Sequence, residues 1–258
     1  FDKIINEAKN LVKSGSREIT LLGQNVNAYN FVSNGKKYRL SNLLIELEKI
    51  DSLVRVRFTT SHPKDMTADL IDCFESCSKL MPFLHLPVQS GSDKILKLMN
   101  RKHDIKLYYS IIEKLKKANP NMGFSSDFIV GYPGEEDVDF KKTIELVKKI
   151  EFINSYSFIF SARPGTPSSR LSNIDNMVTK TRLQIIQNEL FNLQIKKNKE
   201  LEKNKLEVLV ENKLNKQDSF FGRTKKMTPV IFESENCKPG DLIQVEIISS
   251  NQNNLFGR

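Results

Sequence analysis

The sequence predicts an α/β fold with a parallel sheet, followed by a long helix and a small all-β barrel. Up to about residue 160, β-rich runs alternate with helical patterns of roughly 10–15 residues. A polar, amphipathic helical pattern then covers about residues 179–204, and from Leu206 onward the apolar residues recur with period two. We therefore expect three parts, at residues 1–175, 176–204 and 205–258.

The first part is expected to form repeated β–α–β units. Helices are predicted before Gly15 and at residues 40–50, 65–80, 92–99, 104–118 and 137–150. Strands are predicted at residues 19–22, 53–60, 83–88, 122–130 and 155–161. Strands joined through helices run parallel, because such connections cross over and return in the same direction.

Each predicted strand of this part ends in a polar or glycine-bearing turn. These turns occupy residues 23–27, 60–63, 89–92, 131–136 and 161–167. Ligands of parallel α/β proteins bind at the carboxyl ends of the strands, so these turns are expected to form one functional rim.

The second half of the chain is expected to link this sheet to a small barrel. In the long helix, the apolar residues near one stripe are Leu183, Ile186, Leu190, Leu193 and Leu201. Its Gln and Asn content suits a helix that bridges two bodies. Short strands are predicted at residues 206–210, 220–224, 229–232, 242–248 and 255–257. Five short strands in so few residues suggest a barrel resembling an OB fold.

Composition narrows the class of protein. The chain has 258 residues and a formal net charge of +9, which favours a polyanionic partner, although the basic excess is spread along the chain. The sequence has no run of about 18 apolar residues, which is the length that a membrane-spanning helix requires. We expect a cytoplasmic protein with no membrane partner. Because the chain begins Phe1-Asp-Lys without an initiator Met, it could be a fragment.

The cysteines do not form a recognisable metal site. Cys73 and Cys77 are four residues apart on one helical face, but no third Cys or His lies near them at ligand spacing. Cys237 is remote in sequence. Buried core thiols are the favoured interpretation of the pair, and no metal ligand is assigned in this chain.

Three polar residues of the rim suit a nucleoside joined to an amino acid. Gln89 can donate to and accept from a ribose hydroxyl, and Arg101 can bind a carboxylate through two hydrogen bonds. Asp127, expected at the end of the next strand, can bind ribose hydroxyls or an amine. S-adenosylmethionine combines these groups. Individually, Arg101 could instead be a surface ion pair and Asp127 a cap.

Over nearly its whole length the chain resembles the radical S-adenosylmethionine methylthiotransferases. The matching motifs include His85-Leu-Pro-Val-Gln-Ser-Gly-Ser92 and Asp127-Phe-Ile-Val-Gly-Tyr-Pro-Gly-Glu135. The others are Glu18-Ile-Thr-Leu-Leu-Gly-Gln-Asn-Val-Asn-Ala-Tyr29, Arg163-Pro-Gly-Thr-Pro167 and Arg182-Leu-Gln184. In the tail, Phe221-Gly-Arg-Thr224 and Lys238-Pro-Gly-Asp241 resemble the TRAM domain, an RNA-binding β-barrel.

The resemblance implies a fold and a set of binding residues. It implies a partial (β/α)6-type radical S-adenosylmethionine barrel, a linker helix and a TRAM barrel. For S-adenosylmethionine it implies Gln89 near the ribose, Arg101 on the methionine carboxylate and Asp127 near the nucleoside, with Asn25 and Ser61 as weaker assignments. Arg163 is expected to face the substrate or an auxiliary cluster, by position only.

The resemblance also implies an activity, cofactors and partners. Residues 21–29 favour the members that add a methylthio group to C2 of a prenylated adenosine beside the tRNA anticodon. The expected partners are the tRNA anticodon stem-loop, S-adenosylmethionine and a reducing protein of the flavodoxin or ferredoxin type. The family also binds two [4Fe–4S] clusters through cysteine triplets that are missing from this chain. We therefore expect the chain to lack its first barrel strand and cluster loop, and to be inactive alone.

Other functions also fit parts of the sequence. Relatives in the same family modify a threonylcarbamoyl adenosine or a ribosomal-protein aspartate. The chain could also act only as an RNA-binding module, with Phe221 as a stacking residue and Arg223, Lys225 and Lys226 on phosphates. Strand alternation predicts that Phe220, its neighbour, is core. An unrelated acid–base enzyme is the weakest alternative, because the three histidines show no Ser-His-Asp spacing.

Overall fold

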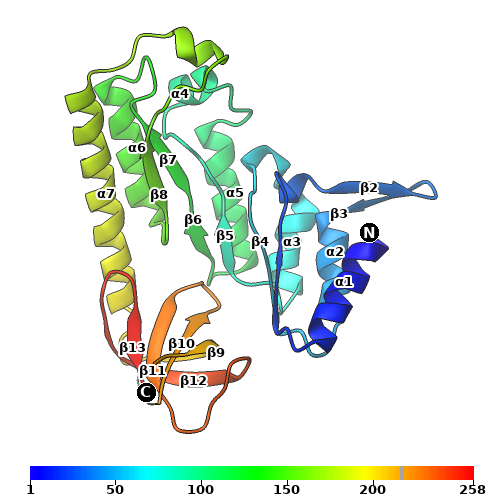
Figure 1. The fold of residues 1–258 in the computed structure, drawn as a ribbon. Helices are drawn as coiled ribbons and strands as arrows, with labels where there is room; N and C mark the ends of the chain where they lie inside the picture. Colours follow the sequence, from blue (N-terminus) through cyan, green and yellow to red (C-terminus); the bar gives the residue numbers. More distant parts are fainter. Residues whose placement is uncertain (216–217) are drawn as a thin grey trace.

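A computed structural model describes residues 1–215 and 218–258 and has the predicted order of parts. A parallel sheet with its helices forms the upper body, a closed β-barrel lies below it, and one long helix runs down the side between them (Figure 1). No helix in the described part of the chain is both long and apolar enough to cross a membrane.

The parallel sheet consists of three strand pairs joined by single bridges. β1 (Glu18–Leu21) pairs with β4 (Arg55–Phe58), β5 (Phe83–His85) with β6 (Gly123–Ser125), and β7 (Asp127–Val130) with β8 (Tyr156–Ile159). Parallel bridges at Val56–Leu80 and Gln89–Phe128 connect neighbouring pairs. The strands therefore follow one another in an open, partial barrel, as the sequence predicted.

Helices cover the outer face of this sheet. They are α1 (Asp2–Lys13), α2 (Leu40–Glu48), α3 (Ala68–Ser76), α4 (Asp93–Leu98), α5 (Ile105–Ala118) and α6 (Asp137–Ile150). Short 3₁₀ turns, η1 (Val26–Ala28), η2 (Pro63–Asp65) and η3 (Pro167–Arg170), lie in the loops. Leu84, Leu86, Phe128 and Val130 are fully buried between sheet and helices. Cys73 and Cys77 are buried free thiols in the same core, which confirms their interpretation.

Three local predictions were wrong. The hairpin β2 (Asn30–Ser33) and β3 (Lys36–Arg39) was not predicted. Residues 122–130 form two strands because Ser126 uses its hydroxyl to accept from the Val88 amide and its own amide to donate to Ser155 Oγ. The helix expected at residues 65–80 covers only Ala68–Ser76, since η2 precedes it.

The linker helix α7 (Asn176–Lys199) packs against both bodies. Its first turn is capped by Asp175, whose carboxylate accepts from the amides of Met177 and Val178. Ile186, Leu190 and Leu193 face the core of the upper body. Gln194 accepts from the Asn154 amide, and Asn198 donates to the carbonyls of Asn251 and Gln252. The amide side chains thus join the helix to both bodies, which accounts for its Gln and Asn content.

The C-terminal barrel closes as a five-stranded sheet in the order β10–β11–β13–β12–β9. These strands are β9 (Lys205–Lys213), β10 (Ser219–Thr224), β11 (Pro229–Glu233), β12 (Leu242–Ser250) and β13 (Leu255–Gly257). Phe220 and Phe232 stack in its core with centroids 5.9 Å apart, so Phe220 is core as predicted. A side chain at Gly222 would lie 2.3 Å from the Leu209 carbonyl oxygen, so only glycine fits there.

Candidate functional site

The turn after β5 holds Gln89 in an unusual backbone conformation. Its φ is 75°, in the left-handed region that residues other than glycine rarely adopt. The Gln89 amide donates to the Asp127 carbonyl at 3.0 Å, and its carbonyl accepts from Ile129 at 2.9 Å. The neighbouring strand therefore enforces this conformation. The Gln89 side chain makes no hydrogen bond to any described residue and is available to a ligand.

The rest of this turn is held by α6. Ser92 donates to Asp139 at 2.6 Å, and the Gly91 amide donates to Thr143 Oγ1 at 2.9 Å. A side chain at Gly91 would lie 2.4 Å from the Lys142 carbonyl oxygen. Gly91 and Ser92 therefore serve the fold. Of the motif at residues 85–92, Gln89 is the residue left for binding.

Arg101 is a half-buried cation without an anionic partner. Within residues 1–215 and 218–258 its guanidinium makes no ion pair or hydrogen bond. Burial lowers its pKa, and the charge of Asp127 acts in the opposite direction. A buried cation without a partner is costly, and a ligand carboxylate would remove that cost.

Asp127 lies near Arg101, but not where the sequence predicted. It opens β7 instead of closing a strand, because Ser126 divides the predicted strand before it. Its Oδ2 is 3.5 Å from His85 Nε2. Ser125 Oγ donates to the Asn154 carbonyl, so it accepts from His85 Nδ1, at 2.9 Å. These two hydrogen bonds orient His85 toward Asp127.

Two histidines that were not predicted as site residues complete the group. The rings of His62 and His103 meet edge to face at 5.4 Å. Burial lowers the pKa of His103 to about 4, and the charges of His62 and Arg101 add to this effect. Burial and Arg101 also lower the pKa of His62. Their positions, directly after Ser61 and two residues after Arg101, could have signalled their place on the rim.

Asn25 and Ser61 add buried polar atoms that lack partners. Asn25 donates to Asp65 at 2.7 Å, but its Oδ1 accepts no hydrogen bond from the described residues. Ser61 Oγ is likewise buried and unpaired in the part of the chain that the structure describes. Thr60, before Ser61, has a φ of 60°. Unpaired buried polar atoms and strained residues in one region are typical of ligand sites.

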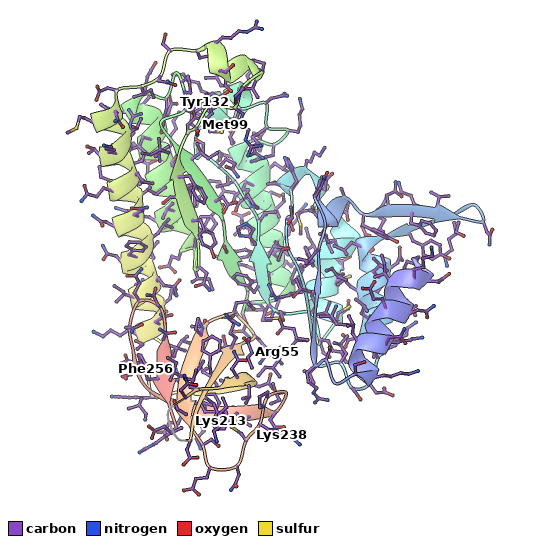
Figure 2. The ribbon with its side chains drawn as sticks, in the orientation of Figure 1. Arg55, Met99, Tyr132, Lys213, Lys238 and Phe256 are labelled. Atoms are coloured by element: carbon purple, nitrogen blue, oxygen red, sulfur yellow. The ribbon has the colours of Figure 1, made fainter. Side chains whose placement is uncertain are left out.

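The next rim turn, residues 131–136, is locked by the linker helix. Arg182 donates to the Glu135 carbonyl at 3.1 Å and to Asp137 at 2.7 Å, and lies 3.4 Å from the Glu135 carboxylate. Burial raises the pKa of Glu135. Tyr132, at the same end of the molecule as Met99 (Figure 2), donates to the Leu98 carbonyl. Arg182, the first residue of the motif at residues 182–184, therefore stabilises this turn.

Arg163 is not brought into this group. It lies in an exposed loop beyond β8, and its carbonyl accepts from Thr166. The structure joins Gln89, Arg101 and Asp127 through backbone contacts and charge, with Asn25 and Ser61 on the neighbouring strand ends.

The donor set fits S-adenosylmethionine and does not fit an iron–sulfur cluster. An unpaired guanidinium, a free amide, a carboxylate and unpaired hydroxyl and amide oxygens match its carboxylate, amine and ribose groups. No three His, Cys, Asp or Glu residues among those described are grouped to hold a metal. Burial raises the pKa of Cys73 to about 12, which opposes the thiolate that a cluster requires.

The C-terminal barrel presents the residues predicted to bind RNA. Arg223 stacks over the half-buried Phe221 at 4.8 Å and pairs with Glu211. Lys225 pairs with Glu207 at 3.2 Å. Lys226 is half-buried, and burial lowers its pKa. Acidic neighbours thus already hold two of the cations.

Two family models match the chain. The model of the radical SAM superfamily covers residues 1–147, and that of the TRAM domain covers residues 199–258. The chain is also similar to curated enzymes named tRNA-2-methylthio-N(6)-dimethylallyladenosine synthase. The protein of Pelagibacter ubique is 62% identical over 258 residues, which is 100% of this chain and 58% of that protein. The protein of Rickettsia akari is 44% identical over 259 residues, with 99% and 58% covered. The chain therefore spans 58% of the length of these relatives.

A solved structure shares the fold at low identity. It is the radical S-adenosylmethionine methyltransferase TsrM from Kitasatospora setae, with cobalamin and a [4Fe–4S] cluster bound. The TM-score is 0.50 and the identity 12%, over 64% of this chain and 32% of that one. At this identity the likeness supports the fold alone.

Proposed function

Because the chain belongs to the radical SAM superfamily, we propose that the rim formed by Asn25, Ser61, Gln89, Arg101 and Asp127 binds S-adenosylmethionine. We further propose that it does so as part of a tRNA methylthiotransferase that modifies C2 of a prenylated adenosine next to the anticodon. The chain is 62% identical to a protein named tRNA-2-methylthio-N(6)-dimethylallyladenosine synthase, which supports that choice of substrate.

The observation that carries the binding proposal is the unpaired cation of Arg101. It is half-buried beside Asp127, and no described residue supplies it with a carboxylate within ion-pair distance. Free amino acids and S-adenosylmethionine carry such a carboxylate, but only the latter also uses the nucleoside-binding groups nearby.

Each residue has one task in this proposal. Arg101 binds the methionine carboxylate through charge-assisted hydrogen bonds, and the Gln89 amide binds a ribose hydroxyl. Asp127 binds the amine or a ribose hydroxyl, and His85, whose Nε2 lies 3.5 Å from its Oδ2, orients the carboxylate. Ser61 Oγ and Asn25 Oδ1, both buried and unpaired, gain partners when the ligand is bound.

The whole enzyme needs groups that the described cysteines do not hold. The superfamily uses S-adenosylmethionine with a [4Fe–4S] cluster, and we infer two clusters and a flavodoxin- or ferredoxin-type reductant for the full-length protein. When bound, S-adenosylmethionine supplies a sulfonium that can be reductively cleaved. The residues described here bind and orient it, and we derive no step from Cys73 or Cys77.

The parts of the chain divide these tasks. We assign S-adenosylmethionine binding to residues 1–175, bridging to residues 176–204 and RNA binding to residues 205–258. The match of residues 199–258 to the TRAM model supports the last assignment. Phe221, Arg223, Lys225 and Lys226 are the proposed tRNA contacts, and Arg163 is proposed to face the substrate or an auxiliary cluster. The enzyme would then act in the cytoplasm, where tRNA is modified.

Calorimetry of the purified chain with S-adenosylmethionine tests the binding proposal. We expect binding to a single site that is lost in Arg101→Ala. Mass spectrometry of tRNA tests the substrate, using a deletion strain complemented by the full-length gene. Restored methylthiolation of the prenylated adenosine supports the proposal, whereas restoration only on threonylcarbamoyl adenosine or on a ribosomal-protein aspartate rejects it.

An RNA-binding module without enzymatic function is the second candidate, favoured by the closed C-terminal barrel. It predicts RNA binding by this chain without any affinity for S-adenosylmethionine. The same calorimetric titration therefore separates the two functions.

A further inference from the structure

A large crevice lies between the parallel sheet and the C-terminal barrel and extends to His85, at the end of β5. It has a volume of about 640 Å³. The sheet contributes Arg57 and His85, the linker helix Phe191 and Gln194, and the C-terminal barrel Arg223 and Asn253. Among the described residues that line it, none is Asp or Glu. Cations, amides and aromatic rings therefore face this space together.

The strand β8 continues this surface with an unusual row of aromatic side chains. Tyr156 lines the crevice and is 60% exposed, and Phe158, two residues on, is 53% exposed. Since strand residues alternate between faces, Phe158 lies on the same face as Tyr156, and Phe160 directly follows the strand. Ile159, on the opposite face, packs against the core. At the rim end, Phe160 meets Tyr132 edge to face at 4.7 Å.

This row forms a track from the C-terminal barrel to the rim. His85 lines the crevice and also lies 3.5 Å from Asp127, so the crevice adjoins the proposed S-adenosylmethionine site. Large aromatic side chains exposed at successive positions of one strand face are unusual on a monomer surface and mark binding surfaces. A ligand that fits this face of β8 has flat, apolar surfaces and polar groups that can contact cations and amides.

We propose that Tyr156 and Phe158 are the stacking surface for an unpaired nucleotide of the substrate RNA. Unstacked bases bind proteins through aromatic side chains and hydrogen-bonding amides, while arginines meet the phosphates. The crevice supplies the rings and amides. Its arginines are paired, Arg57 with Glu18 and Arg223 with Glu211, so the exposed aromatic rings carry the proposal. The inference rests on the proposed function, since it requires an RNA substrate.

Fluorescence of an anticodon stem-loop RNA tests this role with the full-length protein. The probe carries 2-aminopurine, whose emission is quenched by stacking, in place of the target adenine. We expect quenching on binding to the wild type. Phe158→Ala should weaken binding about tenfold and restore much of the emission, because each stacked base contributes substantially to affinity.

Matched variants separate stacking from other effects. Tyr156→Phe keeps the ring and should bind within twofold of the wild type, while Phe158→Leu keeps an apolar side chain of similar reach and should weaken binding as Phe158→Ala does. Phe31→Ala removes a Phe that is 39% exposed on the β2–β3 hairpin, outside the track, and should have no effect. Thermal melting checks that each variant is folded.

The results that would contradict the stacking role can be distinguished from those that would contradict the proposed function. Unchanged RNA affinity in Phe158→Ala, or no quenching in the wild type, overturns the stacking role, as would happen if another protein segment covers this face. If S-adenosylmethionine also fails to bind the wild type, the proposed function is lost as well. If it binds as expected, only the track is rejected.

Discussion

The arginines at the two ends of the parallel sheet differ in their protein partners. At the amino end, Arg55 is only 1% exposed, yet it donates to the Arg223 carbonyl at 2.7 Å and lies 3.6 Å from the Glu207 carboxylate. Figure 2 shows it at the junction with the C-terminal barrel. At the carboxyl end, Arg101 and Ser61 have no such partners among the described residues.

This difference separates a structural role from the proposed binding role. The same residue type, arginine, donates to two protein carbonyls at one end, where only its Nε lacks a partner among the described residues, and makes no hydrogen bond to them at the other. A satisfied buried group stabilises the fold, while an unsatisfied one lowers stability until a ligand binds. Substitutions at the two ends should therefore affect different measurements.

The largest expected effect is on ligand affinity at the carboxyl end. Arg101→Ala should weaken S-adenosylmethionine binding about a hundredfold, because the carboxylate loses its charge-assisted hydrogen bonds. The free energy of unfolding should not fall, since the arginine has no protein partner. Calorimetry and urea unfolding measure the two quantities. Arg163→Ala, in the exposed loop, is the control and should retain wild-type affinity for S-adenosylmethionine. A stable fold with unchanged affinity would reject the assignment of Arg101.

At the amino end the effect should fall on stability. Arg55→Met removes the donor from the Arg223 and Glu207 carbonyls, and should lower the free energy of unfolding by about 2 kcal/mol. The affinity for S-adenosylmethionine should stay within twofold. Arg39→Met breaks an exposed pair with Asp69 and should cost less than about 0.5 kcal/mol. Equal losses in both variants, by urea unfolding, would contradict the structural role of Arg55.

The rim histidine should make stability depend on pH. The pKa of His103 is lowered to about 4, so the unfolded chain takes up a proton below about pH 6.5 while the folded chain does not. The free energy of unfolding should therefore fall as the pH is lowered from 6.5 to 4, by about 2.5 kcal/mol from this group. Urea unfolding of His103→Gln should show a shallower fall over the same range. Parallel curves for both proteins would contradict the burial of an uncharged His103.

The smallest effect is expected on the C-terminal barrel. Lys225→Ala/Lys226→Ala should weaken tRNA binding only about threefold and flatten its salt dependence, since each phosphate contact contributes to the slope. The effect is small because Lys225 is paired with Glu207 and Lys226 is half-buried. Filter binding at several salt concentrations measures this. An unchanged affinity and slope at low salt would exclude these lysines from the interface.

Periodicity and strand-end turns predicted most of the fold. They located the parallel strands, the linker helix and the five strands of the C-terminal barrel. The β2–β3 hairpin was missed, although its turn, Asn34-Gly35, has positive φ at both residues and is a typical hairpin signal. The division at Ser126 could not be predicted, because it depends on hydrogen bonds to Val88 and Ser155, which are distant in sequence.

The sequence suggested the residue types of the proposed site but not their environment. Gln89, Arg101 and Asp127 were identified from their chemistry and the family resemblance. Arg101 is unpaired, whereas Arg182 is bound by Glu135 and Asp137. This difference depends on tertiary packing, since the partners of Arg182 lie more than forty residues from it in sequence. The pairing of His62 with His103 is likewise visible only in three dimensions.

Hydrogen–deuterium exchange with and without S-adenosylmethionine tests the central claim most directly. The ligand should slow exchange in peptides that cover residues 60–62, 89–92 and 100–103 at the carboxyl end, and leave those from residues 205–213 and 219–224 unchanged. Slowed exchange only in the C-terminal barrel, or no change at saturating ligand, would contradict the assignment of the rim as the S-adenosylmethionine site.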